Sequence, residues 1–379
     1  MRILHLIDSG GLYGAEKMLV CLVQEQIKQG LEPMILSAGK PGIDEKPIEK
    51  EARVKGLPVT PWRMKPGLNL KESRKILIWA KKRGYVLLHS HGFKFNVLLG
   101  MYPERFRRIP MVATLHGYVH APRFSKLWLY EILDRLAIRR MRGVVLVGEA
   151  MRSELPGKSS TDHVVVIPNG LNIDEVQAAS REELGEPFKS FIDNHNVVIL
   201  GVGRLSQEKG FDRLISAFSE FRKQKPGSGL IIVGEGGFRQ QFEKLIGDLN
   251  LEGDVLLPGY CSTVPSLMSR SNLLVVPSLT EGLPITLLEA IALKTSVVAS
   301  VVGEMPKVLC NGQGGRLLSD VNPETICKAI SESIADSEDT DKKTVCAYDN
   351  LARNYSSEAM AVGYLGFYYS ALTAQGNFE

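Results

Sequence analysis

No apolar run in this 379-residue sequence approaches the ~18 residues that a membrane-spanning helix needs. The apolar opening segment ends at Asp8, where a signal peptide would continue through a longer apolar region. Cysteine is scarce: the five residues are odd in number and form no CxxC pair, which argues against a disulfide framework and a zinc site. These absences predict a cytoplasmic protein, either free or peripheral on the inner face of the membrane.

Charge is unevenly distributed along the chain, although the net charge is only +4. Residues 1–173 carry 28 Lys and Arg against 15 Asp and Glu, whereas residues 174–379 carry 18 against 27. The basic first half favours an anionic partner, such as membrane phospholipid or a phosphate-bearing acceptor, and no nucleic acid is expected. The candidate membrane contacts are the basic clusters at 81–83, 105–108 and 139–142. A merely solvated basic surface is the alternative.

Short apolar runs alternate with amphipathic helical stretches in both halves, a pattern typical of doubly wound parallel sheets. Ligands of such sheets bind beyond the carboxyl ends of the strands. We place the domain boundary near Pro168-Asn169-Gly170. The predicted strands are 2–8, 32–38, 86–92, 111–116, 144–147 and 164–168 in the first half, and 197–203, 230–234, 255–257, 273–277 and 297–300 in the second.

The most informative stretch is residues 273–290. A buried strand leads into a loop holding Glu281 and Gly282, and Pro284 then suits the first turn of a helix. The N–H groups at the start of that helix favour a phosphate, and Glu289 in its second turn can accept hydrogen bonds from hydroxyls. For a lone Glu a surface role would be the better interpretation, but two carboxylates that flank an anion site suit a sugar nucleotide.

A second strand exit, residues 201–210, carries Arg204 and Lys209 around a loop that enters a helix. Two cations and free N–H groups would hold a diphosphate there, and a solvated pair of cations is the alternative.

In the first half, a glycine-containing loop, 10–14, follows the first strand and lets backbone approach a phosphate or sugar. The second strand ends without the acidic residue that would hold a dinucleotide ribose, so nicotinamide chemistry is not expected. His116 stands at a later strand exit, beside Gly117, where a structural role is as reasonable as a functional one. His89 and His91 occupy another exit.

Asp339-Thr340-Asp341 has the DxD form by which some transferases hold a metal. It follows no strand and lies in an acidic stretch before a late helix. We interpret it as solvated charge and expect no metal.

The sequence resembles the retaining glycosyltransferases of family 4, also called glycosyl transferases group 1, over nearly its whole length. The most specific element is the Glu-x7-Glu pattern of Glu281 and Glu289. Three further stretches agree in order and position: 203–210, 167–170 and 11–16. The resemblance implies the GT-B fold, an α/β arrangement of two facing Rossmann-like doubly wound domains. Residues 1–173 with about 357–379 would bind the acceptor, residues 174–356 would bind the nucleotide sugar, and the C-terminal helix would cross back to the first domain.

The resemblance also implies roles for individual residues. Arg204 and Lys209 look like the diphosphate cations, Glu289 like the acceptor of ribose hydroxyls, and Glu281 like the residue that holds the donor sugar. The catalytic set would be His116, Arg204, Lys209 and Glu281. The remaining donor contacts would be Gly11, Gly203, Tyr260, Gly282, Leu283 and Pro284. One departure concerns donor choice: Glu304 and Lys307 stand where many members carry Gly and Glu.

The activity implied is metal-independent transfer, with retention, of a sugar from a UDP- or GDP-linked donor and without a further cofactor. The acceptor would be a glycan or a lipid-linked intermediate of cell-surface polysaccharide synthesis. Two alternatives stay open: a sugar-nucleotide epimerase of similar fold, and a non-catalytic nucleotide-sugar-binding protein.

Overall fold

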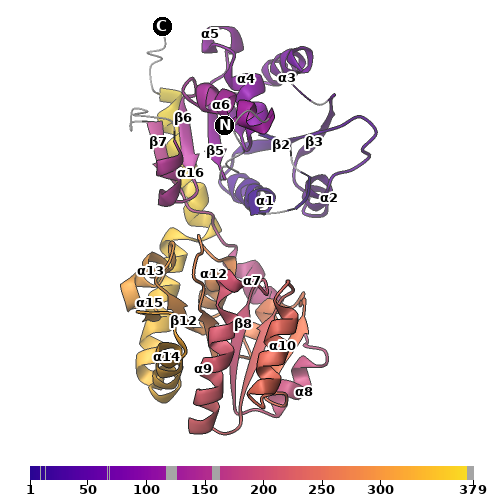
Figure 1. The fold of residues 1–379 in the computed structure, drawn as a ribbon. Helices are drawn as coiled ribbons and strands as arrows, with labels where there is room; N and C mark the ends of the chain where they lie inside the picture. The colour runs from indigo at the N-terminus through magenta and orange to yellow at the C-terminus, as the bar shows by residue number, and fades with distance from the viewer. Residues whose placement is uncertain are drawn as a thin grey trace. The chain divides into compact units, whose positions relative to one another are not determined.

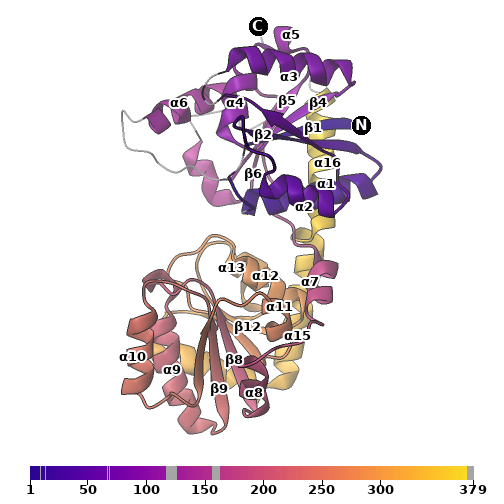
Figure 2. The same ribbon diagram turned by 90° about the vertical axis from the view of Figure 1, so that its right-hand side faces the viewer.

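The computed structural model describes residues 1–8, 10–12, 14–65, 67, 69–116, 126–155 and 163–373. The chain divides into two compact units: unit 1 is Met1–Gly170 together with Ser357–Glu379, and unit 2 is Leu171–Ser356. Each unit is a parallel sheet covered by helices on both faces (Figures 1 and 2), which confirms the predicted fold class.

Unit 1 contains a seven-stranded sheet in the order β3-β2-β1-β4-β5-β6-β7, with every paired strand parallel. The central strands are buried on both faces, as sheets between two helical layers require. Their bounds are β1 Arg2–Ile7, β2 Glu32–Gly39, β3 Val59–Arg63, β4 Leu87–Ser90, β5 Met111–Leu115, β6 Gly143–Leu146 and β7 Val164–Val166.

Helices cover the two faces of this sheet separately (Figure 2). On one face lie α3 Leu70–Lys82, α4 Phe93–Gly100, α5 Glu104–Arg107 and α6 Lys126–Ile138; a 3-10 turn, η1 Glu149–Glu154, follows β6. On the other face lie α1 Gly14–Lys28, α2 Pro47–Val54 and α16 Ser357–Thr373.

Helix α16 joins unit 1 from the far end of the chain and completes its core, as the family resemblance implies. Tyr364 and Tyr368 are almost fully buried against the sheet. The Tyr364 hydroxyl lies 2.9 Å from the Thr114 hydroxyl, and the Tyr368 hydroxyl lies 2.7 Å from His89 Nδ1. Buried aromatic bodies with satisfied hydroxyls fix α16 in one position.

Unit 2 contains a six-stranded parallel sheet in the order β10-β9-β8-β11-β12-β13. Its strands are β8 Val197–Val202, β9 Ser228–Val233, β10 Val255–Gly259, β11 Leu273–Val276, β12 Ser296–Ser300 and β13 Arg316–Leu318. One face packs on α9 Phe211–Gln224, α10 Arg239–Asp248 and α14 Pro323–Ala335. The other packs on α7 Ile173–Ala179, α11 Val264–Met268, α12 Ile285–Ala292, α13 Met305–Val308 and α15 Ser337–Asn354. Helix α8 Phe188–Asp193 and the 3-10 turns η3 Gln207–Lys209 and η4 Cys310–Gly312 complete the unit.

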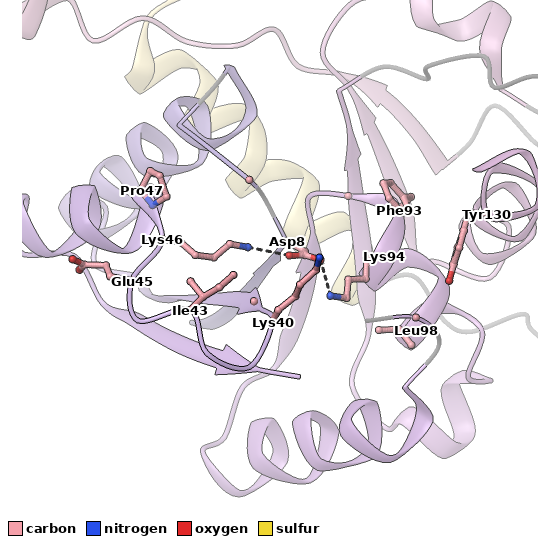
Figure 3. Close-up of a pocket in the computed structure, with 14 residues that line it drawn as sticks. Asp8, Lys40, Ile43, Glu45, Lys46, Pro47, Phe93, Lys94, Leu98 and Tyr130 are labelled. Carbon is pink, nitrogen blue, oxygen red and sulfur yellow. Dashed lines mark hydrogen bonds and ion pairs between the residues drawn. The ribbon is translucent and has the colours of Figure 1, made fainter. Parts of the chain in front are cut away.

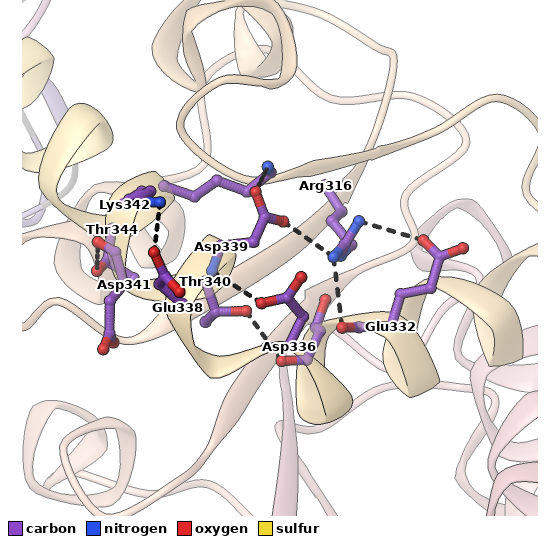
Figure 4. Close-up of polar contacts among 11 residues, drawn as sticks. Arg316, Glu332, Asp336, Glu338, Asp339, Thr340, Asp341, Lys342 and Thr344 are labelled. Carbon is purple, nitrogen blue, oxygen red and sulfur yellow. Dashed lines mark hydrogen bonds and ion pairs between the residues drawn. The ribbon is translucent and has the colours of Figure 1, made fainter.

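The DxD-like stretch lies in the first turns of α15, where an ion-pair network holds the edge of unit 2 (Figure 4). Arg316 on β13 donates to Glu332 on α14 at 3.1 Å and to Asp339 on α15 at 3.0 Å. Lys343 donates to the same Asp339 carboxylate at 2.6 Å. Arg316 therefore ties β13, α14 and α15 together, and the Asp339 side chain belongs to this network rather than standing as solvated charge.

In each sheet the connections reverse direction at one point, between β1 and β4 in unit 1 and between β8 and β11 in unit 2. A crevice opens beyond the carboxyl ends of the strands at such a switch point, because the loops on either side turn to opposite faces. The loops after these four strands are therefore where ligands are expected.

Candidate active site

The switch point of unit 2 brings together two of the predicted site residues. Lys209, in the loop after β8, donates from Nζ to Glu281 Oε2, in the loop after β11. Ser278 Oγ lies 3.4 Å from the same carboxylate oxygen. Both charged side chains are about four-fifths buried, with 23% and 19% exposed. An ion pair this sheltered positions both groups before any ligand arrives.

Glycines let three loops pack closely around this pair. Gly210 adopts φ +67°, and a Cβ there would stand closer than 3.0 Å to the carbonyl oxygen of Pro277. Gly303 adopts φ +57°, and a Cβ there would collide with the carbonyl oxygens of Glu281 and Gly282. Gly282 itself faces open space. The Gly282 carbonyl is thus packed closely against Gly303, while the side of Gly282 that a Cβ would occupy stays open to a ligand.

Arg204 lies in the same loop as Lys209 but is not held by an ion pair. Arg204 is exposed, and its guanidinium makes no hydrogen bond or ion pair with the described part of the chain. Gly203, one residue earlier, donates its N–H to the Val233 carbonyl at 3.0 Å, which aligns the loop with the end of β9.

A glycine-rich loop after β9, residues 234–237, was not among the predicted site elements. Gly234 adopts φ +145°, and a Cβ there would collide with the Gly203 carbonyl. A Cβ on Gly236 would collide with the backbone of Leu205. The signal for this loop was available in the sequence, since Gly-Glu-Gly-Gly directly follows a buried strand.

Helix α12 begins one residue later than predicted, because Pro284 is its N-cap with an extended ψ of 125°. Pro284 is buried and Leu283 is half-buried. Glu289, the fifth residue of the helix, is half-buried. Tyr260 follows β10, the outer strand beyond β9, and is 80% exposed. Strand β9 therefore separates the strand before Tyr260 from β8 and β11, whose loops carry the Lys209–Glu281 pair.

In unit 1, the loop after β1 presents Gly10 rather than Gly11. Gly10 lines a cavity and has open space around its Cα, whereas Gly11 is buried. The predicted Gly117 lies outside the described residues. His116 directly follows β5, its Nε2 is buried without a hydrogen-bond partner among the described residues, and burial lowers its pKa to about 4.

Three more histidines, on β1, on β4 and directly after β4, form a buried cluster that the sequence did not reveal as a group. His5 Nδ1 lies 3.0 Å from His91 Nε2, and His5 Nε2 lies 2.8 Å from the Gln26 amide oxygen. His89 is hydrogen-bonded through both ring nitrogens, to Tyr368 and to Thr114 at 2.8 Å. Burial lowers the pKa of His5 to about 4 and holds the pKa values of His89 and His91 well below their usual range.

The hydrogen bonds assign the protons in this cluster. Gln26 Oε1 accepts from His5 Nε2, so His5 Nδ1 must accept from His91 Nε2, and a neutral His91 keeps a bare Nδ1. The three rings are close enough to hold a metal ion. Only His91 Nδ1 is without a hydrogen bond, however, so a metal would have to displace the others.

Comparison with known proteins agrees with this architecture. The profile described as Glycosyl transferases group 1 matches residues 184–348, and that described as Glycosyltransferase Family 4 matches residues 13–175. An uncharacterized glycosyltransferase of Methanocaldococcus jannaschii is 32% identical over 154 residues, covering 40% of this chain and 38% of that protein.

Two further similarities concern an enzyme and a solved structure. The UDP-Gal:alpha-D-GlcNAc-diphosphoundecaprenol alpha-1,3-galactosyltransferase of Escherichia coli is 27% identical over 219 residues, covering 55% of this chain and 56% of that enzyme. The chain thus spans less than two thirds of both relatives. The crystal structure of Anabaena HepE in complex with UDP superimposes with a TM-score of 0.75 at 20% identity, covering 98% of this chain and 100% of HepE. The two profiles between them account for most of both units, and the chain belongs to the group 1 glycosyltransferases, with the GT-B fold.

Proposed function

We propose that the chain transfers a sugar from a nucleoside-diphosphate sugar, with UDP as the nucleotide tested first, to a glycan or lipid-linked acceptor. The observation that carries the proposal is the Lys209–Glu281 pair at the switch point of unit 2, beside the accessible backbone of Gly282 and the start of α12. A cation for phosphate, a carboxylate for sugar hydroxyls and a helix N-terminus together match a sugar joined to a diphosphate.

In the reaction proposed, the bond between the anomeric carbon and the diphosphate oxygen breaks, and the nucleoside diphosphate leaves with the electron pair. The acceptor oxygen bonds to the same carbon on the same face, so configuration is retained, and its proton passes to the departing phosphate. Arg204 and Lys209 stabilise the charge that grows on that phosphate, which accelerates the step without a metal. Glu281 would orient the sugar, Glu289 the ribose, and neutral His116 would contact the transferred sugar.

The choice of donor and acceptor rests on the relatives. The HepE structure contains UDP, and the Escherichia coli enzyme uses UDP-galactose and a diphosphoundecaprenol-linked acceptor by its name. Both indicate a uridine nucleotide as the first donor to test and a lipid-linked sugar as the first acceptor.

The experiment compares Lys209→Met with Lys223→Met, a matched change of an exposed lysine on α9. We expect turnover of UDP-sugar with a lipid-linked acceptor to fall by about 10²–10³ in Lys209→Met, as when a transition-state donor is lost, and to be unchanged in the control. Equal turnover in the two folded variants would refute the role of Lys209. Product analysis without an acceptor separates transfer from epimerisation, and binding without any product would indicate a non-catalytic protein.

We infer also that unit 1 contacts an anionic membrane through α3 and α5. Exposed apolar side chains accompany the basic ones there: Leu70 is 62%, Ile78 47% and Phe106 65% exposed. Such a mixture suits an interface rather than free solution. Among the described residues no helix is long and apolar enough to cross a membrane.

Two of the arginines assigned to this surface from sequence face inward. Arg107 is 2% exposed and donates to the backbone carbonyls of Ile109 and Tyr102, and Arg142 is ion-paired with Glu104. Flotation with vesicles of phosphatidylcholine, with and without phosphatidylglycerol, tests the remaining surface. Phe106→Ser should lower binding to the anionic vesicles, and equal flotation with both vesicle types would contradict the inference.

A further inference from the structure

The switch point of unit 1 holds a cavity of about 670 Å³. Figure 3 shows residues that line it, and all the described lining residues belong to unit 1. The cavity wall is built at the carboxyl ends of β1, β2 and β4, with one side chain from α6. The volume lies in the range of small-molecule sites, ~300–1,000 Å³. The principal side chains are Asp8, Lys40, Lys46, Phe93, Lys94 and Tyr130.

Positive charge dominates the polar part of the wall. Asp8 Oδ1 accepts from Lys46 at 3.0 Å and Asp8 Oδ2 accepts from Lys94 at 2.6 Å, so one carboxylate serves two ammonium groups. The third lysine, Lys40, makes no ion pair with the described residues. Glu45 also borders the cavity but is paired with Arg53. Among the described lining residues, three lysines against one available carboxylate leave an excess of two positive charges.

Asp8 is held as a carboxylate. Burial raises its pKa, but the hydrogen bonds from Lys94 and Lys46 and their charges outweigh burial, and the net pKa is lowered. Lys46 is only 7% exposed and also donates to the Ala38 carbonyl. Asp8 and Lys46 are therefore a fixed support, and Lys94 and Lys40 are the cations nearest to solvent.

The other part of the wall is apolar and partly aromatic. The rings of Phe93 and Tyr130 lie with centroids 6.1 Å apart, and Phe93 is 50% exposed. Gly10, Gly67 and Gly92 also line the cavity, and a Cβ on any of them would meet nothing within 4 Å. An aromatic surface beside open backbone suits the ring face and the hydroxyls of a sugar.

We propose that this cavity binds a phosphate or diphosphate group borne by the acceptor, with Lys40 and Lys94 as its ligands. The proposal rests on the proposed function, since it names the class of acceptor that the same enzyme uses. Ammonium groups on separate stems act as point charges that suit phosphate, whereas planar carboxylate recognition favours the arginine fork, and the described lining residues include no arginine. The acceptor could be a soluble sugar phosphate or a lipid-linked diphosphate sugar, which share this group.

The probe is inorganic pyrophosphate, titrated calorimetrically into the full chain. The variants are Lys40→Glu, Lys50→Glu as an equal charge change on an exposed lysine of α2 outside the cavity, and Lys209→Ala to remove a donor-site cation. Lys40 has no ion pair to lose, so its substitution should leave the fold intact, which the melting temperature checks. We expect pyrophosphate affinity to fall at least fivefold in Lys40→Glu beyond the fall in Lys50→Glu, with UDP affinity the same in both.

These measurements distinguish a lipid-linked from a soluble acceptor, and they distinguish failure of the cavity proposal from failure of the proposed function. If Lys40→Glu also weakens use of a lipid-linked diphosphate acceptor, the lipid-linked source is supported; if only a soluble sugar phosphate is affected, the soluble source is. Equal pyrophosphate affinity in Lys40→Glu and Lys50→Glu overturns the proposal. Pyrophosphate binding that is lost only in Lys209→Ala overturns it as well, because the anion then binds at the donor site. If UDP binding and turnover both persist in every Lys209 variant, that result would instead count against the proposed function.

Discussion

Lowering the pH from 7 to 5 should destabilise unit 1 much more than unit 2. Four histidines of unit 1, His5, His89, His91 and His116, are buried in their neutral form, and burial lowers the pKa of each. The unfolded chain protonates them near the usual value of about 6.5. Between that pH and the lowered folded pKa, the unfolded state binds more protons, so stability is complete above pH 6.5 and falls as the pH falls.

The size of the effect follows from the two histidines whose folded pKa is about 4, His5 and His116. A pH of 5 lies about 1.5 units below the unfolded pKa, and the free energy of unfolding falls by about 1.36 kcal/mol per unit for each histidine. Each of the two therefore lowers the free energy of unfolding by about 2 kcal/mol. The two together should remove about 4 kcal/mol, and His89 and His91 act in the same direction. The total free energy of unfolding of a folded domain is only about 5–15 kcal/mol.

Tryptophan fluorescence isolates unit 1, because Trp62, Trp79 and Trp128 all belong to it. Urea unfolding followed by this emission should give a free energy of unfolding lower by about 4 kcal/mol or more at pH 5 than at pH 7. In His5→Gln, which keeps a polar side chain that does not titrate, the difference should shrink by about 2 kcal/mol. His195→Gln, in unit 2, is the control. A pH-independent transition, or the same pH difference in both variants, would refute the reasoning.

Two further predictions concern unit 2. Gly303→Ala should lower the melting temperature, because its Cβ would collide with the carbonyl oxygens of Glu281 and Gly282, whereas Gly282→Ala should leave stability unchanged and weaken nucleotide-sugar binding by calorimetry. If Gly282→Ala bound the donor normally, the donor would not approach that backbone. Asp339→Asn should leave turnover unchanged and slightly lower the free energy of unfolding measured with urea, because it weakens the contact with Arg316; a loss of turnover restored by added divalent cation would show a metal role instead.

The strands predicted from sequence are those with a continuous apolar run. β3 and β13 were not predicted because both are edge strands with a weak apolar signal: β3 contains Pro61 and no fully buried residue, and β13 has three residues, two of them half-buried. An edge strand needs neither a continuous apolar run nor every backbone donor, so its sequence can lack the usual signal. The other two edge strands, β7 and β10, keep short apolar runs and were predicted. The existence of β3 and β13 depends on pairing with β2 and β12, which local sequence does not encode.

The burial of some polar residues was also not predicted from the sequence. Arg107 sits in a run of basic residues, yet it is buried because three backbone carbonyls at the end of α4 and α5 converge on its guanidinium. His5 lies inside an apolar strand and acquires its hydrogen-bond partners from the residue after β4 and from α1. In both cases the residue type was informative only after distant segments had supplied the hydrogen-bond partners.

The two candidate sites differ in how far sequence could reveal them, and the difference is topological. In unit 2, the loops after β8 and β11 each carry a compact pattern, so Lys209 and Glu281 could be selected before their ion pair was seen. In unit 1, the described cavity residues come from five separate stretches, 8–10, 39–47, 67, 92–98 and 130, and only the strand order β2-β1-β4 brings Asp8, Lys40 and Lys94 to one edge. A site assembled from stretches this far apart leaves no local pattern. If the cavity selects the acceptor, then acceptor class has to be determined from the folded unit, by measurements such as the Lys40→Glu titration.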